Sequence, residues 1–572
     1  MPASHCKMNL QSISGMKKLL AVVSCLILLY PGRSVAQDLL QGKVSGNLQL
    51  DAQFYQPDSA IGAYEVSETM LSNAFANILY QQGNFNAGLR FESYLNPILG
   101  YDKRYKGTGV PYWFASWDKD KFGITVGNFY EQFGSGMTLR SYEERNLGYD
   151  NAIRGARFIF RPYQGVALKA VIGQQRFFWE TGPGIVRGLD AEASLNDLLG
   201  SHAGDMPQIT VGGSFVSKFE PTARVLSGPN GDRELILPEN VAALAGRFNI
   251  NHRGFMLDGE YAYKYNDPSA MNGFIYHQGQ SLLLQASYSQ KGFGAILSGK
   301  VTDNMSFKSK RTEKGNVLDI NYLPALTRQH AYSLAAMYPY ATQPNGEVAL
   351  QGQVNYKIPK GSVLGGKYGT DIAVNYSRIT SLNRSAVNDS IPIGEGGTLG
   401  YTTNFFAFGD ELYFQDINVE IQHKFSSDFK ALVSWVNLNY NIDVIEGHPG
   451  EEMVKANIFI LDATYKFTPR NAVKAELQHL STKQDEGNWA QALVEFTFAP
   501  SWYFTVMDQY NYGNDDKDRR FHYPTIAAGY THGSSRLSLS YGKQREGIIC
   551  VGGVCRTVPA SNGLTVTLTS SF

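Results

Sequence analysis

Apolar and polar residues alternate one by one over much of this chain. In "VSGNLQLDAQF" (44–54), leucine, alanine and phenylalanine alternate with serine, asparagine, glutamine and aspartate, and the pattern returns at 85–92, 255–264, 417–422, 494–498 and 564–572. Because successive side chains of a β-strand point to opposite faces, each stretch predicts a strand with one apolar and one polar face. Such strands, often ended by Tyr or Phe, are typical of transmembrane barrels, with apolar residues toward lipid and polar residues toward the lumen. The pattern predicts an all-β protein, a large transmembrane antiparallel β-barrel.

Short and long connections separate these stretches. Short periplasmic turns and long external loops are typical of outer-membrane barrels. With both termini periplasmic, nine clear turns predict about 20 strands, and candidate turns at 196–206 and 342–346 raise the number to about 24, so we expect an even number of about 20–26. The pattern is weakest over 304–412. The nine turns lie at 82–84, 118–121, 161–165, 251–254, 290–292, 426–428, 468–471, 499–501 and 533–535, and longer links at 56–70, 130–151, 304–329, 380–412 and 546–562.

The final stretch, "GLTVTLTSSF" (563–572), places Leu564, Val566, Leu568 and Phe572 on one side of a strand. A last strand that is closed by a carboxy-terminal Phe resembles the insertion signal that the barrel assembly machinery reads. A sheet in lipid avoids unpaired edges only by closing, so this strand should pair with the first, near 44–55. The alternative is a soluble, secreted all-β protein that hides its apolar faces in a core. That alternative predicts no such terminal strand.

The first 36 residues have the layout of a cleaved secretory signal: basic residues at 17–18, an apolar run at 19–30 and small residues at 34–36. We therefore expect 1–36 to be removed and 37–572 to form a single barrel domain. The apolar run is too short to span a bilayer as a helix. Cys25 offers a lipoprotein signal as an alternative, although its surroundings match a lipoprotein cleavage site poorly.

Two cysteines remain after the leader, and they stand close together in "CVGGVC" (550–555). Because an exported chain enters an oxidising compartment, we expect Cys550 and Cys555 to form a disulfide. The whole chain has 51 basic and 51 acidic residues, and the leader removes basic residues only, so the mature chain is slightly acidic. This balance indicates no nucleic-acid partner.

One stretch of the sequence carries a resemblance to a known family. The segment "GNFYEQFGSGMTLRSYEERNLGYDNAIRGARF" (127–158) is similar to part of a large, uncharacterised outer-membrane family of Bacteroidetes-type bacteria, a domain of unknown function. The resemblance runs over most of the mature chain. It implies a porin-like outer-membrane β-barrel and a bacterial lineage, but no activity and no functional residues.

The same stretch carries a dense set of opposite charges. In porins an early external loop folds into the lumen, where opposing acidic and basic rows sort solutes by charge. The alternative is an ordinary exposed loop with neutralising pairs, and the last arginines could belong to the lumen face of the following strand. The pore-lining candidates are Glu131, Arg140, Glu143, Glu144, Arg145, Asp150, Arg154 and Arg157.

No pattern of catalytic residues stands out, so we expect the protein not to be an enzyme. Gly134-Ser135-Gly136 lacks the G-x-S-x-G spacing of a nucleophile elbow and is interpreted as a turn. "NDDKD" (514–518) offers carboxylates that Ca²⁺ prefers, but it lacks the glycine and the distal glutamate of a calcium loop, so we interpret it as a solvated loop tip. We expect no metal and no cofactor.

Two functions fit these observations. The first is a pore for small hydrophilic solutes in the outer membrane of a Gram-negative bacterium, with lipid and the assembly machinery as partners. A barrel of 20 or more strands is wider than side chains can fill, so its lumen is either a channel or is blocked by loops. The second is a structural barrel, or one associated with assembly or secretion, whose lumen the links at 304–329 and 380–412 block. The sequence names no solute and no surface partner.

Overall fold

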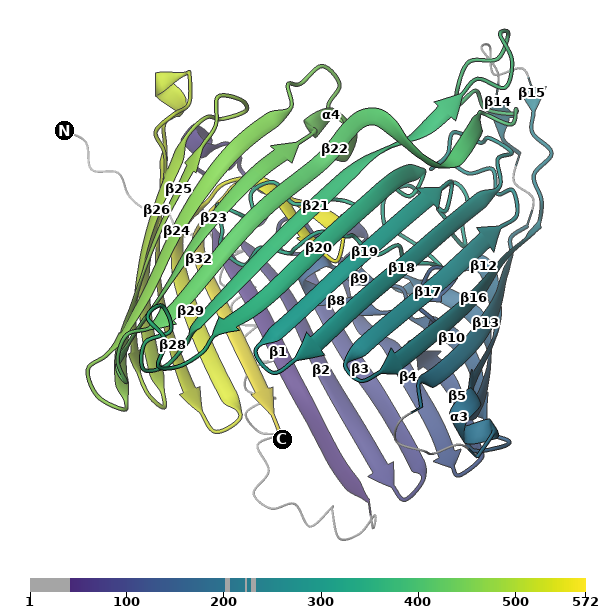
Figure 1. Ribbon diagram of the computed structural model, residues 1–572, viewed down its shortest axis with the longest axis horizontal. Helices are drawn as coiled ribbons and strands as arrows, with labels where there is room; N and C mark the ends of the chain where they lie inside the picture. The colour runs from purple at the N-terminus through teal and green to yellow at the C-terminus, as the bar shows by residue number, and fades with distance from the viewer. Residues whose placement is uncertain (1–41, 201–205, 222–223, 228–232) are drawn as a thin grey trace.

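The computed structural model describes residues 42–572 except 201–205, 222–223 and 228–232. The described residues form a closed antiparallel barrel of 24 strands (Figure 1). The first strand, β1 (Lys43–Tyr55), pairs with β2 (Met70–Gln82) on one side and with the last strand, β32 (Ser561–Ser571), on the other. The predicted all-β barrel with an even strand number is confirmed. The predicted leader, 1–36, lies outside the described residues.

The first half of the wall continues in chain order. Its strands are β3 (Phe85–Asn96), β4 (Gly107–Lys119), β5 (Phe122–Phe129), β10 (Ile153–Phe160), β11 (Val166–Phe177), β12 (Glu180–Ser194), β13 (Gln208–Phe219), β16 (Asn240–His252), β17 (Phe255–Lys264), β18 (Gly279–Gln290) and β19 (Phe293–Asp303). Each wall strand pairs antiparallel with the wall strand before it and with the one after it.

The second half of the wall follows the same up-and-down order. Its strands are β20 (Gly346–Ile358), β21 (Thr370–Ser385), β22 (Thr402–Lys424), β23 (Phe429–Tyr440), β24 (Val454–Lys466), β25 (Asn471–Ser481), β26 (Trp489–Phe498), β27 (Trp502–Asn511), β28 (His522–His532) and β29 (Ser535–Gln544). β29 pairs with β32, which completes the circle.

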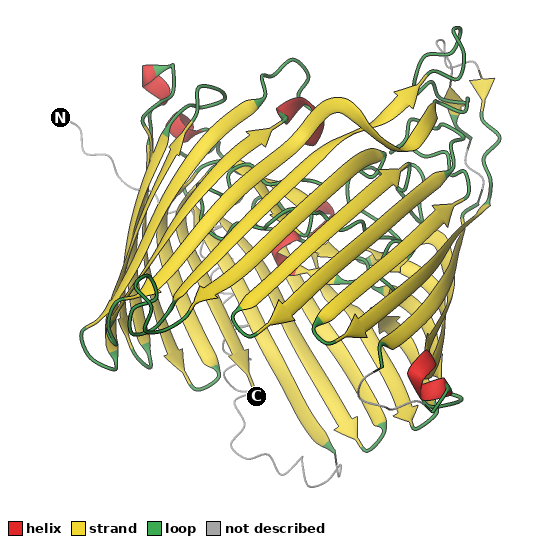
Figure 2. Ribbon diagram, in the orientation of Figure 1, coloured by secondary structure: helices red, strands yellow, loops and turns green. Residues whose placement is uncertain are grey.

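Short elements lie in the connections. Figure 2 shows a wall made of strands, with helical turns only between them. No helix among the described residues is long and apolar enough to cross a membrane. The short elements in the connections are β6 (Gln132–Phe133), β7 (Leu139–Arg140), β8 (Glu143–Glu144), β9 (Tyr149–Asp150), β14 (Leu226–Ser227), β15 (Arg233–Glu234), β30 (Gly547–Val551), β31 (Val554–Val558), α3 (Leu195–Leu198), α4 (Ile442–Ile445), η1 (Ser59–Ile61), η2 (Lys103–Tyr105), η3 (Arg145–Leu147) and η4 (Lys517–Arg519).

The two rims of the barrel differ. One rim, here called the turn rim, holds most of the short connections and the end of β32; the other, the loop rim, holds most of the long ones (Figure 1). All nine clear predicted turns lie on the turn rim, and so does the connection between β12 and β13, part of which is outside the described residues. The candidate turn at 342–346 was wrong: these residues end the long link before β20 and include its first residue, Gly346, on the loop rim, and the eleventh turn is 359–369. The predicted link at 380–412 also differs, because β21 and β22 extend into it and leave only 386–401 as a loop.

The wall has the predicted alternation of faces over much of its height. On β5, Ile124 and Val126 are 47% and 43% exposed, whereas Thr125 between them is 4% exposed. The exposed side chains point outward and form an apolar surface that no other segment of the described chain covers. Such a surface on a closed barrel suits lipid.

Near the loop rim of β23 and β24 this alternation is reversed. Val436, Leu438 and Ile458 point inward and are at most 1% exposed, whereas Asn437 and Asn457 point outward and hydrogen bond to each other. The reversal indicates that these strands continue beyond the apolar belt and enclose an apolar interior. Residues of the link between β19 and β20 fill this interior.

Candidate functional site

Residues 304–345, which connect β19 to β20, fold into the barrel; we call this segment the plug. The plug contacts the inner face on opposite parts of the wall. In the first half of the plug, the Asp319 carbonyl accepts a hydrogen bond from the Gln175 side-chain amide on β11 at 2.6 Å. Further along, His330 Nε2 lies 2.6 Å from an Asp416 carboxylate oxygen on β22, and the Leu334 N–H donates to the Gln478 side chain on β25 at 2.9 Å. The plug therefore crosses the lumen.

A second segment, residues 130–152, lies between the plug and the wall; we call it the inner loop. Its backbone pairs with that of the plug, because the Arg140 N–H donates to the Ile320 carbonyl and the Tyr322 N–H donates to the Gly136 carbonyl, both at 2.9 Å. The Asn321 amide also donates to the Met137 carbonyl at 3.2 Å. Backbone pairing satisfies polar groups that burial would otherwise leave without partners. The two segments thus form one packed unit.

The hairpin of β30 and β31 packs against this unit from the loop rim. Cys550 and Cys555 form a disulfide within the hairpin, and their carbonyl oxygens accept hydrogen bonds from plug side chains, Gln329 at 3.1 Å and Asn316 at 2.8 Å. At the tip of the hairpin, the Gly553 carbonyl accepts a hydrogen bond from the plug backbone. The disulfide therefore constrains a hairpin that covers the plug.

A buried charge network fixes the inner loop to the wall. Asp150 accepts a hydrogen bond from Arg176 of β11 at 2.7 Å and also pairs with Arg90 of β3. Both arginines pair with Glu92 of β3, at 2.7 and 2.6 Å, and Arg90 pairs with Glu143 at 2.8 Å. Desolvation makes an unpaired buried charge costly, so each charge in the network depends on the others. The pKa of the Asp150 carboxyl is lowered: burial raises it, but Arg176, Arg90 and hydrogen bonds outweigh burial.

The other predicted charges of the inner loop also lie inside the barrel. Glu131 pairs with Arg157 and Lys169 on the wall, at 3.3 and 2.9 Å. The Arg145 guanidinium pairs with Glu143 at 2.9 Å, and Glu144 accepts a hydrogen bond from a backbone N–H of its own turn. Glu131, Glu143, Glu144, Arg145, Asp150 and Arg157 therefore lie together on the inner side of the wall.

Two predicted arginines differ from this set. The Arg140 guanidinium lies between aromatic rings, 4.5 Å from the centre of Tyr142 and 4.0 Å from that of Tyr322. Arg154 does not lie in the lumen. It shares the outer face of β10 with Phe158, which is 42% exposed, and its guanidinium is 5.9 Å from the exposed Trp113 ring. A strand alternates its faces, so Arg154 and Arg157, three positions apart, must point to opposite sides.

Sequence reasoning missed a set of buried lysines that hold the plug. Lys218, Lys264 and Lys300, on β13, β17 and β19, are at most 1% exposed, and each donates to a plug carbonyl. Lys218 also pairs with Asp267 at 2.8 Å, and Lys300 with Glu347 at 2.6 Å. Each lysine is one polar residue in an alternating strand. Its position on the inner face was predictable, but its plug partner was not.

A further ion pair lies within the plug itself. Lys308 donates to an Asp319 carboxylate oxygen at 2.5 Å, and the same ammonium donates to the carbonyls of Gly315 and Val317. Burial raises the pKa of the Asp319 carboxyl, and the Lys308 ammonium opposes this effect. The pair closes the turn of the plug over 308–319.

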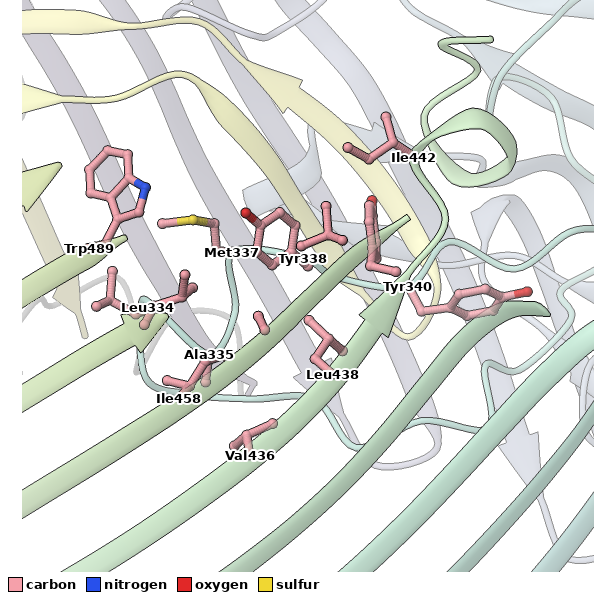
Figure 3. Packing of buried hydrophobic residues seen from close by; sticks show 14 of the residues in the cluster. Leu334, Ala335, Met337, Tyr338, Tyr340, Val436, Leu438, Ile442, Ile458 and Trp489 are labelled. Carbon is pink, nitrogen blue, oxygen red and sulfur yellow. The ribbon is translucent and has the colours of Figure 1, made fainter. Parts of the chain in front are cut away.

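An apolar core attaches the second half of the plug to the wall. Figure 3 shows Leu334, Met337 and Tyr338 of the plug beside Val436, Leu438 and Ile458 of the wall, with Trp489 at the edge of the group. Leu334 and Trp489 are fully buried. Tyr340 continues the core, with its ring centre 5.4 Å from that of Phe414. Burial of these side chains supplies an apolar driving force for plug packing.

A cavity of about 480 Å³ opens at the loop rim above this core; we call it the mouth cavity. Met337 and Tyr338 of the plug form part of its lining. The Tyr338 hydroxyl donates to an Asp485 carboxylate oxygen at 2.9 Å. Burial raises the pKa of the neighbouring Glu486 carboxyl; Asp485 raises it further, whereas Arg545 and Arg519 lower it. The remaining lining comes from 59–64, 442–451, 519–523 and 546–548.

The described residues contain no cluster of three or more His, Cys, Asp or Glu side chains arranged to hold a metal ion. Gly134 and Gly136 both have positive φ, and the Ser135 N–H donates to Glu260 at 2.7 Å, so this segment is a turn held against the wall. His423 lies near the turn rim, where its Nδ1 is 2.6 Å from the Thr370 hydroxyl.

One family model matches residues 16–572, which is nearly the whole chain; its description is a family of unknown function, DUF6029. The chain belongs to this family. Membership agrees with the family resemblance of 127–158, while the Bacteroidetes-type lineage stays a prediction. No curated protein matches the chain.

Solved structures of low identity match the chain over most of its length. OccAB4 of Acinetobacter baumannii is 11% identical, with a TM-score of 0.32, over 93% of this chain and 98% of that one. The outer membrane protein opdK of Pseudomonas aeruginosa is 10% identical, with a TM-score of 0.34, over 81% and 99%. A mutant of the ferric enterobactin receptor of P. aeruginosa is 12% identical, with a TM-score of 0.40, over 93% and 80%. Likenesses of this degree carry no argument about what this chain does.

Proposed function

We propose that this protein is a gated channel for small hydrophilic solutes in the outer membrane of a Gram-negative bacterium, closed by its own plug in the conformation described. The observation that carries the proposal is the plug, a segment of the chain that crosses the lumen between two parts of the inner wall. The turn rim then faces the periplasm and the loop rim faces outward.

The two surfaces of the wall support this function. The outer face is an apolar belt that suits lipid, whereas the inner face near the inner loop carries Arg90, Glu92, Lys169 and Arg176. A barrel of 24 strands encloses more space than side chains alone can fill, so removal of the plug leaves a water-filled path. Charged walls would then filter solutes by charge and hydrogen bonding rather than by catalysis.

The second candidate function is a structural barrel, or one associated with secretion, in which the plug never moves. The extent of plug packing favours it, because the plug buries both an apolar core and ion pairs such as Lys300 with Glu347. The two functions differ in a measurable property. A channel must open in the wild-type protein, whereas a structural barrel stays closed.

Planar bilayers containing the purified protein distinguish these functions. Asp303 and Gly346 lie opposite each other in the ladder of β19 and β20, so an Asn-Gly turn can replace 304–345 without breaking the barrel. We expect intermittent conductance from the wild type and large, steady conductance from this deletion. A second variant, His330→Cys with Asp416→Cys, keeps the whole plug and permits it to be locked to β22 by a short bifunctional thiol reagent, because the parent side-chain atoms are 2.6 Å apart and the shorter cysteines leave a gap that the reagent spans.

The locked variant should be silent after cross-linking, while the single variant His330→Cys, treated with the same reagent, should behave like the wild type. Silence of the wild type over many insertions, with conductance only from the deletion, would overturn the gated channel in favour of the structural barrel. Equal conductance from the locked and unlocked proteins would show that the plug does not gate the path.

A further inference from the structure

We propose that the mouth cavity is a binding site for small cationic solutes, such as short lysine-rich peptides or polyamines, and that a bound solute competes with the plug for Asp485. The inference rests on the proposed function, since it names the class of solute that the channel recognises. The volume of the mouth cavity, about 480 Å³, is typical of a small-molecule site. Six separate connections on the loop rim contribute to the lining, so the cavity is a feature of the assembled barrel and not of one loop.

The charge of the cavity selects the class of ligand. The lining contains five carboxylates, from Glu446, Glu451, Asp485, Glu486 and Glu546, against two guanidinium groups, from Arg519 and Arg545. A concave site with an excess of one charge concentrates ligands of the opposite charge. The excess therefore favours ammonium groups over carboxylates or phosphates.

The internal contacts of these carboxylates leave their charge only partly neutralised. Asp485 accepts a hydrogen bond from the Tyr338 hydroxyl at 2.9 Å, and Glu446 accepts one from the Tyr440 hydroxyl at 3.0 Å. A phenol donates a hydrogen bond but brings no positive charge. Glu486 is 3.7 Å from Arg519, which is an ion pair at the long end of the range. Carboxylates held in this way can still attract a cation.

Aromatic rings complete the recognition surface. Tyr64, Phe521 and Tyr523 line the same cavity, and Tyr64 is 76% exposed. Aromatic faces attract ammonium groups through their quadrupoles, and they also cover the alkyl parts of a lysine side chain. Carboxylates combined with aromatic rings suit an amine ligand with an apolar stem.

Tyr338 connects the cavity to the gate. It belongs to the plug, the centre of its ring lies 5.4 Å from that of Tyr440, and its hydroxyl donates a hydrogen bond to Asp485. A ligand ammonium that pairs with Asp485 weakens this contact of the plug with the rim, because both donors then share the negative charge of one carboxylate. Binding of the ligand and attachment of the plug at this point therefore oppose each other, and a ligand can shift the plug only by such a difference in contacts.

Calorimetric titration of the full-length protein in detergent tests the site, with trilysine as the probe and triglutamate and maltotriose as comparisons. We expect measurable binding of trilysine only. Because a hydrogen bond to a charged group contributes about tenfold or more to affinity, Asp485→Asn with Glu486→Gln should weaken trilysine binding at least about tenfold. The matched control, Asp389→Asn with Glu395→Gln, removes the same charge from the 386–401 loop and should leave binding unchanged.

Tyr338→Phe gives the test an opposite sign. It keeps the buried ring but removes the hydroxyl that Asp485 accepts, so trilysine should bind several times more tightly. Wild-type affinity in the Asp485 and Glu486 double variant, no binding of trilysine, or tighter binding of maltotriose would each overturn the proposed site. Weaker binding in Tyr338→Phe would overturn the competition with the plug. Binding without conductance in bilayers would instead count against the channel, so the two failures are distinguishable.

Discussion

Asp150→Asn tests whether buried charge pairs hold the inner loop against the wall. Asp150 accepts hydrogen bonds from Arg176 at 2.7 Å, from the Tyr130 hydroxyl at 3.1 Å and from the Ala152 N–H at 2.9 Å, and it also pairs with Arg90. Asparagine keeps the size of the side chain and can accept some of these hydrogen bonds. It removes the negative charge, so the substitution isolates the electrostatic contribution.

The network that surrounds Asp150 contains equal numbers of opposite charges. Arg90, Arg145 and Arg176 are balanced by Asp150 and the carboxylates of Glu92 and Glu143. Breaking one buried pair typically costs about 3–5 kcal/mol, because it leaves a buried charge without its partner. The inner loop can separate from the wall while the barrel stays closed, so this cost should appear as local opening of 131–150.

Hydrogen exchange of the detergent-solubilised protein measures this opening. At about 1.4 kcal/mol per factor of ten, the expected loss corresponds to at least about a hundredfold lower protection of the amides in 131–150. The control is Asp118→Asn on the wall, where the pair with Arg161 is 3.3 Å long and the side chains are 50% and 40% exposed. An exposed pair contributes about 0–1 kcal/mol, so protection should barely change.

A second substitution tests the charge balance directly. Arg176→Gln added to Asp150→Asn removes the surplus positive charge, so the double variant should lose less protection than the sum of the single variants. Wild-type protection in Asp150→Asn would refute the reasoning, because the buried network would then contribute nothing to loop attachment. Strict additivity would show that the two charges act independently.

Three further predictions follow from the termini, the hairpin and the inner loop. Deleting Phe572, whose backbone exchanges two hydrogen bonds of 3.0 Å with β1, should lower the fraction folded in the outer membrane, measured by heat-modifiable gel mobility; wild-type yield would contradict a role in insertion. Replacing both hairpin cysteines by serine should speed proteolysis within 547–558, at a cost of about 2 kcal/mol or less, while the midpoint of barrel unfolding stays unchanged. In the conducting plug deletion, neutralising Arg140 with Arg145 should shift the reversal potential toward cations, and neutralising Glu143 with Glu144 toward anions; unchanged potentials in both would place the inner loop outside the path.

The candidate site was only partly readable from the sequence. The density of charge in 131–150 marked the inner loop, because those residues are neighbours in the chain. Their partners could not be identified in this way. Arg90 and Arg176 are 86 positions apart and meet at Asp150 only because the inner loop folds back onto β3 and β11. The mouth cavity was equally hidden, since each of its connections contributes only a few ordinary polar residues.

The sequence by itself determined the wall. Alternation with a period of two is a local property, since it follows from the geometry of one strand, and short turns mark where one strand gives way to the next. The range of strand numbers and the pairing of the first and last strands followed from these signals. The turn at 342–346 was misplaced because 304–345 lacks a regular alternation of polar and apolar residues. The course of this segment depends on contacts with distant parts of the chain, which a local pattern does not reveal.

Only the tertiary structure decided what fills the barrel. The lysines at 218, 264 and 300 meet plug carbonyls, and the inward apolar residues at 436, 438 and 458 meet the plug core, only after the wall has closed around the plug. The same reversal of faces on β23 and β24 that weakens the lipid-facing pattern creates the apolar interior that holds the plug. A strand's own period determines which side a residue faces, whereas the partner across the lumen depends on the closed circle of 24 strands.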